Sequence, residues 1–270
     1  MSDNSAPIGV FDSGVGGLTV AREILRQMPG ERIVYFGDTA RLPYGSKSKD
    51  TVIRYSKQII RFLMTKNVKA IVVACNTASS LALEELQSYV GLPMMGVIHA
   101  GAKAAVEATR NGKIGVIGTE GTIRSDIYRQ MMTAMKPGVE VCQKACPLFV
   151  PLVEEGFFHD SVTDEIASRY LADLKQRYVD TLVLGCTHYP LLRSTLGRLM
   201  GEGVVLVNPA FETALELRKA LGEAGILRGR GEPALHEFYV SDMAEKFTAF
   251  ATSIMPEYVK ETKLVNIEVY

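Results

Sequence analysis

Short apolar runs alternate with stretches of helical period along the first hundred residues. Four runs read as strands, at residues 8–11 (IGVF), 32–36 (RIVYF), 70–74 (AIVVA) and 94–98 (MMGVI). Between the first two runs, Leu18, Ala21, Leu25 and Met28 fall on one face of a predicted helix. Strands that alternate with helices are typical of a parallel sheet covered on both faces. The pattern predicts the α/β class.

The pattern then repeats. Residues 113–122 (KIGVIGTEGT) echo residues 7–17 (PIGVFDSGVGG), and residues 178–189 (YVDTLVLGCTHY) echo residues 67–78 (NVKAIVVACNTA), at offsets of about 106 and 111 residues. Two echoes at similar offsets predict two pseudo-symmetric parallel-sheet α/β domains that face each other across a central cleft. A further strand candidate at 236–241 (HEFYVS) is expected to return to the first domain. The expected domains are residues 1–98 plus 208–270, and residues 99–207.

Composition sets the class of protein. The chain has 270 residues, of which 47% are hydrophobic and 22% charged, and 30 Lys and Arg balance 30 Asp and Glu. This is ordinary for a globular protein and lacks the basic stripe of a nucleic-acid partner. No segment reaches the roughly 18 apolar residues of a membrane span, and the N-terminus lacks a signal pattern. We therefore expect a cytoplasmic protein whose four cysteines are free thiols.

Polar and sulfur side chains directly follow the predicted strands. Asp12 and Cys75 do so in the first domain, and Thr119 and Cys186 in the second. Ligands of open α/β sheets bind beyond the carboxyl ends of the strands, so Cys75 and Cys186 would meet across one cleft. One thiol on each wall can remove a proton from a carbon and return a proton to its opposite face. This arrangement predicts racemisation.

Simpler structural interpretations apply to the same residues. A cysteine after an apolar run is often a small buried hydrophobe, although the duplicated setting argues against this for both thiols. Helix caps would account for Asn76, Thr77 and Thr187, and a capped helix N-terminus at a strand end also binds carboxylates. His188 could be structural, but two residues from a cysteine it is well placed to tune a thiol.

Other chemistries leave weaker signals. The glycine-rich stretch at 12–17 misses the third glycine of the dinucleotide fingerprint, and Asp12 would repel a pyrophosphate. Cys142 and Cys146 have no second ligand pair at zinc spacing, so we expect no metal site. No G-x-S-x-G elbow supports a serine hydrolase. A Cys75–His188 pair would suit a cysteine hydrolase, but that hypothesis leaves Cys186 unexplained.

The motifs FDSGVGGLTV, FGDTARLPYG, VVACNTAS and LGCTHYPLL occur in this order over nearly the whole chain. On these motifs the chain resembles the glutamate racemases of the aspartate/glutamate racemase superfamily. The resemblance implies cofactor-independent conversion of L-glutamate to D-glutamate, which bacteria need for peptidoglycan. It also implies a homodimer that binds a small molecule.

By this resemblance Cys75 and Cys186 are the catalytic thiols, and Asp12, Glu154 and His188 assist proton transfer. The residues implied to hold the substrate are Asp12, Ser13, Tyr44, Gly45, Asn76, Thr77, Thr187 and His188. Two alternatives stay open. An aspartate racemase would share the fold and the thiols, although a Thr-Glu pair is associated with the second cysteine in that branch. A binding protein built on two such domains would hold the ligand without turning it over.

Overall fold

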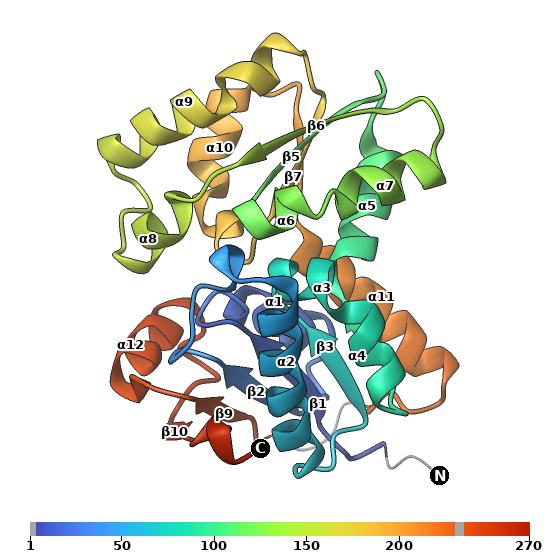
Figure 1. Ribbon diagram of the computed structural model, residues 1–270, viewed down its shortest axis with the longest axis vertical. Helices are drawn as coiled ribbons and strands as arrows, with labels where there is room; N and C mark the ends of the chain where they lie inside the picture. The colour runs from blue at the N-terminus through green and yellow to red at the C-terminus, as the bar shows by residue number, and fades with distance from the viewer. Residues whose placement is uncertain (1–3, 230–234) are drawn as a thin grey trace.

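The computed structural model describes residues 4–229 and 235–270. Residues 1–3 and 230–234, which belong to the first expected domain, lie outside the described residues. The chain forms two parallel β-sheets flanked by helices, one in each half of the molecule (Figure 1). This confirms the predicted fold class.

The first sheet has the strand order β10-β9-β2-β1-β3-β4, and the second has the order β6-β5-β7-β8. The strands of the first sheet are β1 (Ile8–Asp12), β2 (Ile33–Gly37), β3 (Ala70–Val73), β4 (Met94–Gly96), β9 (Glu237–Val240) and β10 (Thr262–Leu264). The strands of the second sheet are β5 (Lys113–Gly118), β6 (Glu140–Ala145), β7 (Thr181–Gly185) and β8 (Val205–Val207). The run β2-β1-β3-β4 therefore recurs as β6-β5-β7-β8. The repeat seen in the sequence is a repeat of topology. The strand predicted at 236–241 is β9, which returns to the first sheet as expected and pairs there with β2.

Helices cover both faces of each sheet. They are α1 (Leu18–Gln27), α2 (Lys49–Met64), α3 (Asn76–Leu81), α4 (Leu83–Tyr89), α5 (Val97–Ala108), α6 (Glu120–Arg124), α7 (Ile127–Met135), α8 (Phe149–Glu154), α9 (Ser161–Gln176), α10 (Arg193–Met200), α11 (Pro209–Glu223) and α12 (Ala244–Ile254). The short 3-10 helices are η1 (Tyr44–Ser46), η2 (Tyr189–Leu192) and η3 (Ile267–Val269). Among the described helices none is long and apolar enough to cross a bilayer.

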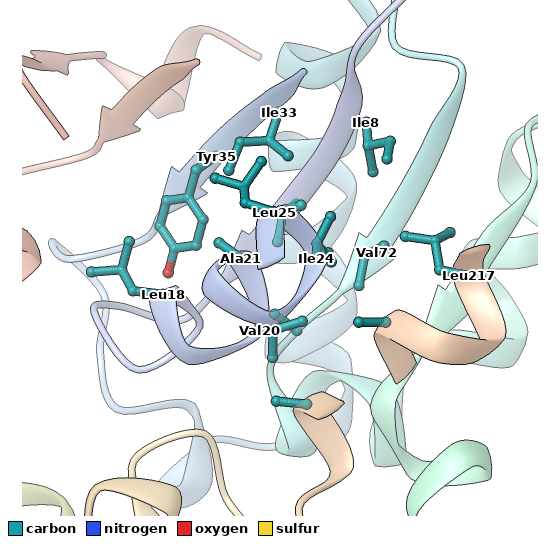
Figure 2. Packing of buried hydrophobic residues seen from close by; sticks show 14 of the residues in the cluster. Ile8, Leu18, Val20, Ala21, Ile24, Leu25, Ile33, Tyr35, Val72 and Leu217 are labelled. Atoms are coloured by element: carbon teal, nitrogen blue, oxygen red, sulfur yellow. The ribbon is translucent and has the colours of Figure 1, made fainter. Parts of the chain in front are cut away.

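The core of the first half positions the loop that follows β1. The predicted apolar face of α1 is buried, and Figure 2 shows Leu18, Ala21 and Leu25 beside Ile33 and Tyr35 of the adjacent strand. Burying side chains of this size contributes about 1.5–3 kcal/mol each. The helix is thus held against the sheet, and the residues before it are held at the carboxyl end of β1.

The run at 94–98 is only partly a strand. Strand β4 ends at Gly96, and Val97 and Ile98 begin α5. The backbone N–H of Val97 donates to Ser79 Oγ at 3.3 Å, so a side chain of α3 satisfies a donor in the first turn of α5. Apolar content alone does not report such a bond, and the prediction of a strand to residue 98 is wrong.

Two helices connect the halves. Helix α5 leads from the first sheet to the second, α11 follows β8 on the way back, and they pack side by side (Figure 1). His99 Nδ1 on α5 lies 3.3 Å from Glu216 Oε2 on α11. The chain therefore crosses between the halves through a packed helix pair.

Candidate active site

A cavity lies between the halves, at the carboxyl ends of the central strands. Its lining residues are Ser13, Gly14, Leu42, Pro43, Tyr44, Gly45, Cys75, Asn76, Thr77, Thr119, Val150, Glu154, Cys186, Thr187 and His188. Every residue implied for catalysis or substrate binding is among them except Asp12. The cavity is narrow, with a volume of about 30 Å³, room for one or two water molecules.

Cys75 sits where β3 turns into α3. Its backbone is extended, and its sulfur accepts from the Ala78 backbone N–H at 3.5 Å, so the thiol itself is the N-cap of α3. Asn76 and Thr77 belong to the first turn of the helix and are not its cap, which corrects the capping interpretation for these two residues. The Cys75 thiol also donates to Ser13 Oγ at 3.7 Å.

Asp12 is fully buried at the end of β1, beneath the loop that forms one wall of the cavity. Its Oδ2 accepts from the backbone N–H groups of Gly14 at 3.1 Å and Gly17 at 3.0 Å. Within the described residues its Oδ1 has no hydrogen-bond partner. Burial raises the pKa of this carboxyl, against the lowering effect of His188 and the backbone N–H groups. In the described structure Asp12 therefore keeps one oxygen, Oδ1, that can still accept a hydrogen bond. Its carboxyl also takes up a proton more readily than an exposed aspartate would.

The setting of Cys75 disfavours a thiolate. Burial, together with the negative charge of Asp12, raises the pKa of the Cys75 thiol to about 12, although the Ala78 N–H and the Ser13 hydroxyl work in the other direction. At neutral pH the thiol is protonated. It can therefore act as a proton donor.

Cys186 has a different neighbour. It follows β7, and its sulfur lies 3.7 Å from His188 Nδ1, while His188 Nε2 lies 3.1 Å from Glu154 Oε1. Burial alone would lower the pKa of His188, but the hydrogen bonds to Cys186 and Glu154 raise it to about 10. The imidazole is thus held protonated at neutral pH. It provides a positive partner for negative charge on the Cys186 sulfur.

Threonine hydroxyls form hydrogen bonds between the two walls. Thr77 Oγ1 and Thr119 Oγ1 share a hydrogen bond of 2.9 Å, and Thr19 Oγ1 donates to the Thr187 carbonyl at 2.9 Å. Both bonds link the first half to the second. Asn76, Thr77 and Thr187 line the cavity with groups that can donate to a carboxylate.

Tyr44 is held by its hydroxyl, which donates to Asp38 Oδ2. Arg41 Nε donates to the same carboxylate at 2.9 Å and 3.0 Å, and Ser241 Oγ donates to it at 2.8 Å. The hydroxyl of Tyr44 is therefore committed to the buried Asp38 carboxylate. These hydrogen bonds to Asp38 hold in place the turn that forms the cavity wall at Tyr44 and Gly45.

The glycines of the site allow close approach. A Cβ at Gly16 would lie 2.3 Å from Thr187 Oγ1, and a Cβ at Gly17 would lie 2.4 Å from Asp12 Cβ. Gly45 is similarly close to Thr119, where a Cβ would lie 2.9 Å from the threonine Cβ. The glycine-rich stretch at 12–17 thus lets the walls of the cleft meet.

Five residues of the cavity lining are not among the site residues that the sequence predicts. At the offset of about 106 residues Thr119 corresponds to Ser13, which also lines the cavity, so the repeat does signal it. The others are Gly14, Leu42, Pro43 and Val150. Leu42 and Val150 carry no chemistry that a sequence pattern could report. Both contribute apolar side chains to the cavity lining.

Cys142 and Cys146 lie outside the cavity lining. Cys142 is in β6, where its thiol donates to Glu140 Oε1 at 3.7 Å, and Cys146 follows the strand. In residues 4–229 and 235–270, no three His, Cys, Asp or Glu side chains gather as metal ligands would.

Comparison with known proteins identifies the family. A profile described as Asp/Glu/Hydantoin racemase matches residues 8–215. The chain belongs to this racemase family. It is 49% identical over 261 residues to a glutamate racemase of Geobacter metallireducens, and the match covers 97% of each chain.

Solved structures of the family agree in fold. The crystal structure of glutamate racemase isoform RacE1 from Bacillus anthracis has a TM-score of 0.94 and 40% identity, with coverage of 97% of this chain and 98% of that one. The glutamate racemase of Francisella tularensis in complex with D-glutamate has a TM-score of 0.92 and 34% identity, with coverage of 99% and 100%. These relatives place the chain among the glutamate racemases, which are isomerases, and confirm the predicted enzyme class.

Proposed function

We propose that the protein interconverts L- and D-glutamate by moving protons between two thiols, Cys75 and Cys186, without a cofactor. The observation that carries the proposal is that both sulfurs line one narrow cavity, each at the carboxyl end of the corresponding strand of a repeated sheet. The family relationship supports the substrate, since the Francisella tularensis relative is described in complex with D-glutamate.

In the L-to-D direction, the Cys186 thiolate takes the α-proton and the Cys75 thiol donates its proton to the opposite face of the carbon. One C–H bond breaks and another forms, and the enzyme is left with a Cys186 thiol and a Cys75 thiolate. The reverse reaction uses the same groups in exchanged roles. The resemblance to the family assigns L-glutamate to Cys186, and this agrees with the positive His188 beside Cys186 and the protonated thiol of Cys75.

The intermediate carries charge on the α-carboxylate, and the cavity supplies donors for it. Asn76, Thr77 and Thr187 are preorganised by the fold, so their dipoles need no rearrangement during the reaction. Asp12 is the proton acceptor for Cys75, and His188, oriented by Glu154, is the partner of Cys186. Ser13, Tyr44 and Gly45 complete the wall against which glutamate lies. The family resemblance also assigns Asp12 to the substrate ammonium, which it would reach through Oδ1 once the halves rearrange around the substrate.

The described state is closed. The cavity of about 30 Å³ and the direct hydrogen bonds across the cleft leave too little room for an amino acid to enter. We propose that the halves separate to admit glutamate and close to exclude water, which strengthens every electrostatic contact inside. The domains that move would be residues 1–98 plus 208–270 and residues 99–207.

The physiological role follows from the same proposal. D-glutamate made by this enzyme would supply peptidoglycan, as the family resemblance implies. The homodimer implied by that resemblance stays a prediction.

Solvent-deuterium exchange tests the function. L-glutamate and D-glutamate in D₂O should each give both enantiomers, and the newly formed enantiomer should carry deuterium at the α-carbon. Aspartate is the matched control and should exchange much more slowly. Equal exchange with aspartate would favour an aspartate racemase, and no exchange with any amino acid would favour a binding protein.

A further inference from the structure

Tyr128 contacts both cysteine loops from α7. Its side chain is fully buried, and its hydroxyl donates to Asn76 Oδ1 at 2.8 Å. Its ring packs on Gly185, where an added Cβ would lie 3.3 Å from the ring atom Cε2. Asn76 directly follows Cys75, and Gly185 directly precedes Cys186. One side chain of the second half therefore touches the neighbours of both thiols.

We propose that Tyr128 is a positioning residue that holds the Asn76 carboxamide in one orientation and keeps the two cysteine loops in register. This inference rests on the function proposed above. Tyr128 is not among the residues that line the cavity, so it acts through Asn76 and Gly185 and does not touch the substrate.

The orientation of the amide decides what Asn76 can do. A carboxamide has one end that accepts hydrogen bonds and one that donates them. Since Tyr128 donates to Oδ1, the NH₂ group of Asn76 is left to donate to a substrate carboxylate. The opposite orientation would turn the carbonyl oxygen toward that carboxylate, and two acceptors would repel.

The Tyr128 hydroxyl is a permanent donor. Burial, with the added effect of charge on Cys186, raises the pKa of Tyr128 far above its ordinary value. The hydroxyl therefore keeps its proton at neutral pH. Within the described part of the chain, Asn76 is the one hydrogen-bond partner that the structure gives it.

The bond also depends on closure. Asn76 belongs to α3 in the first half and Tyr128 to α7 in the second, so the bond forms only when the halves meet. The amide is thus fixed in its donating orientation at the moment when the substrate is enclosed. A residue with this role lowers the reorganisation that binding would otherwise require.

The test is a double-mutant cycle between Tyr128→Phe and Asn76→Ala, read by deuterium exchange into glutamate. Tyr128→Phe keeps the ring on Gly185 and removes only the hydroxyl. We expect it to lower kcat/KM roughly 3- to 10-fold, the size of one lost neutral hydrogen bond, mainly through a higher KM. In the Asn76→Ala background the same change should cost nothing further, because its partner is gone.

Tyr239→Phe is the matched control. Tyr239 is also buried and hydrogen-bonded through its hydroxyl, but it bonds Glu237 and Lys66, which lie outside the cavity lining. The kcat/KM of the Tyr239→Phe enzyme should equal that of the wild type. Additive losses in the cycle, or a Tyr128→Phe enzyme with wild-type KM, would overturn the inference.

A second variant keeps the test decisive if Tyr128→Phe folds poorly. Asn76→Asp retains an oxygen for Tyr128 but has no NH₂ group, so it should lose at least as much kcat/KM as Asn76→Ala. Full activity of Asn76→Asp would show that the donating end is not the functional end, and would sink the inference. Absence of exchange in the wild type would instead reject the proposed function.

Discussion

Cys75 and Cys186 follow equivalent strands of two sheets with the same order, but the first lies near a buried carboxylate and the second beside an imidazole. The negative charge of Asp12 disfavours the thiolate form of Cys75. His188, held by Glu154, draws negative charge toward the Cys186 sulfur. The backbone setting is duplicated, and the proton chemistry is not.

The difference shows how a repeated fold can run one reaction from two faces. The two sulfurs lie at the ends of equivalent strands, while Asp12 and His188 give them different charged neighbours. In the proposed mechanism, the protonated thiol of Cys75 and the positive charge of His188 beside Cys186 suit the enzyme to L-glutamate. Altering the two sides should therefore have unequal consequences.

Removal of either sulfur should have the largest effect. Cys75→Ala and Cys186→Ala should each lower racemisation by about 10⁴-fold, the upper range for loss of an acid–base group. Both should keep the wild-type thermal midpoint to within a few degrees. The measurement is the rate of D-glutamate formation by chiral chromatography, with Cys142→Ala as the control thiol. A mutant that keeps a tenth of the activity would contradict the need for two thiols.

Replacement of Asp12 or His188 should reduce activity less than loss of a thiol, and each replacement should affect a different side of the reaction. Asp12→Asn and His188→Asn should each lower kcat/KM on the order of 10²- to 10³-fold. Since the equilibrium between enantiomers is fixed, kcat/KM must fall equally for both. The asymmetry lies in the primary deuterium isotope effect, which should rise with D-glutamate for Asp12→Asn and with L-glutamate for His188→Asn. The same isotope pattern in both variants would remove the distinction between the sides.

The pH dependence of alkylation should distinguish Cys75 from Cys186. A thiol with a pKa of about 12 is neutral below that pH and charged above it, so about 10⁻⁵ of Cys75 is thiolate at pH 7. Its reaction with iodoacetamide should rise roughly tenfold per pH unit up to pH 11. Cys186, equally buried but paired with His188, should react on the order of 10² faster at pH 7. Peptide mass spectrometry reads both sites, and equal rates at pH 7 would contradict the comparison.

Replacement of Glu154, the carboxylate bonded to His188, should have the smallest effect on activity. Glu154→Gln should lower kcat/KM about tenfold, because the imidazole loses the charged partner that orients it and keeps it protonated. Glu155→Gln is the neighbouring control, since Glu155 lies outside the cavity lining and pairs with Lys246 at 3.4 Å. It should be indistinguishable from the wild type. Equal losses in the two variants would point to a general effect of charge.

Much of this arrangement was visible in the sequence. The repeat at about 106 residues predicted two related parallel-sheet halves, because buried parallel strands leave continuous apolar runs. The echo at about 111 residues singled out Cys75 and Cys186, and the echo at about 106 residues makes Thr119 the counterpart of Ser13.

Other features have no local signature. The start of α5 at Val97 depends on Ser79 from another helix, and the wall at Leu42 and Val150 is simply apolar. Tyr128 lies on an amphipathic helix and reads as core, which it also is. Contacts between distant helices are set by packing, and periodicity along the chain cannot report them.

The central claim is that each thiol serves one face of the substrate, and elimination from an amino acid with a leaving group on its β-carbon tests it most directly. Deprotonation alone commits such an analogue to elimination, so one thiol is enough. Cys75→Ser should eliminate from the L-analogue only, and Cys186→Ser from the D-analogue only, while the wild type eliminates from both. If either serine variant eliminated from both enantiomers at similar rates, a single mobile base would replace the two-thiol account.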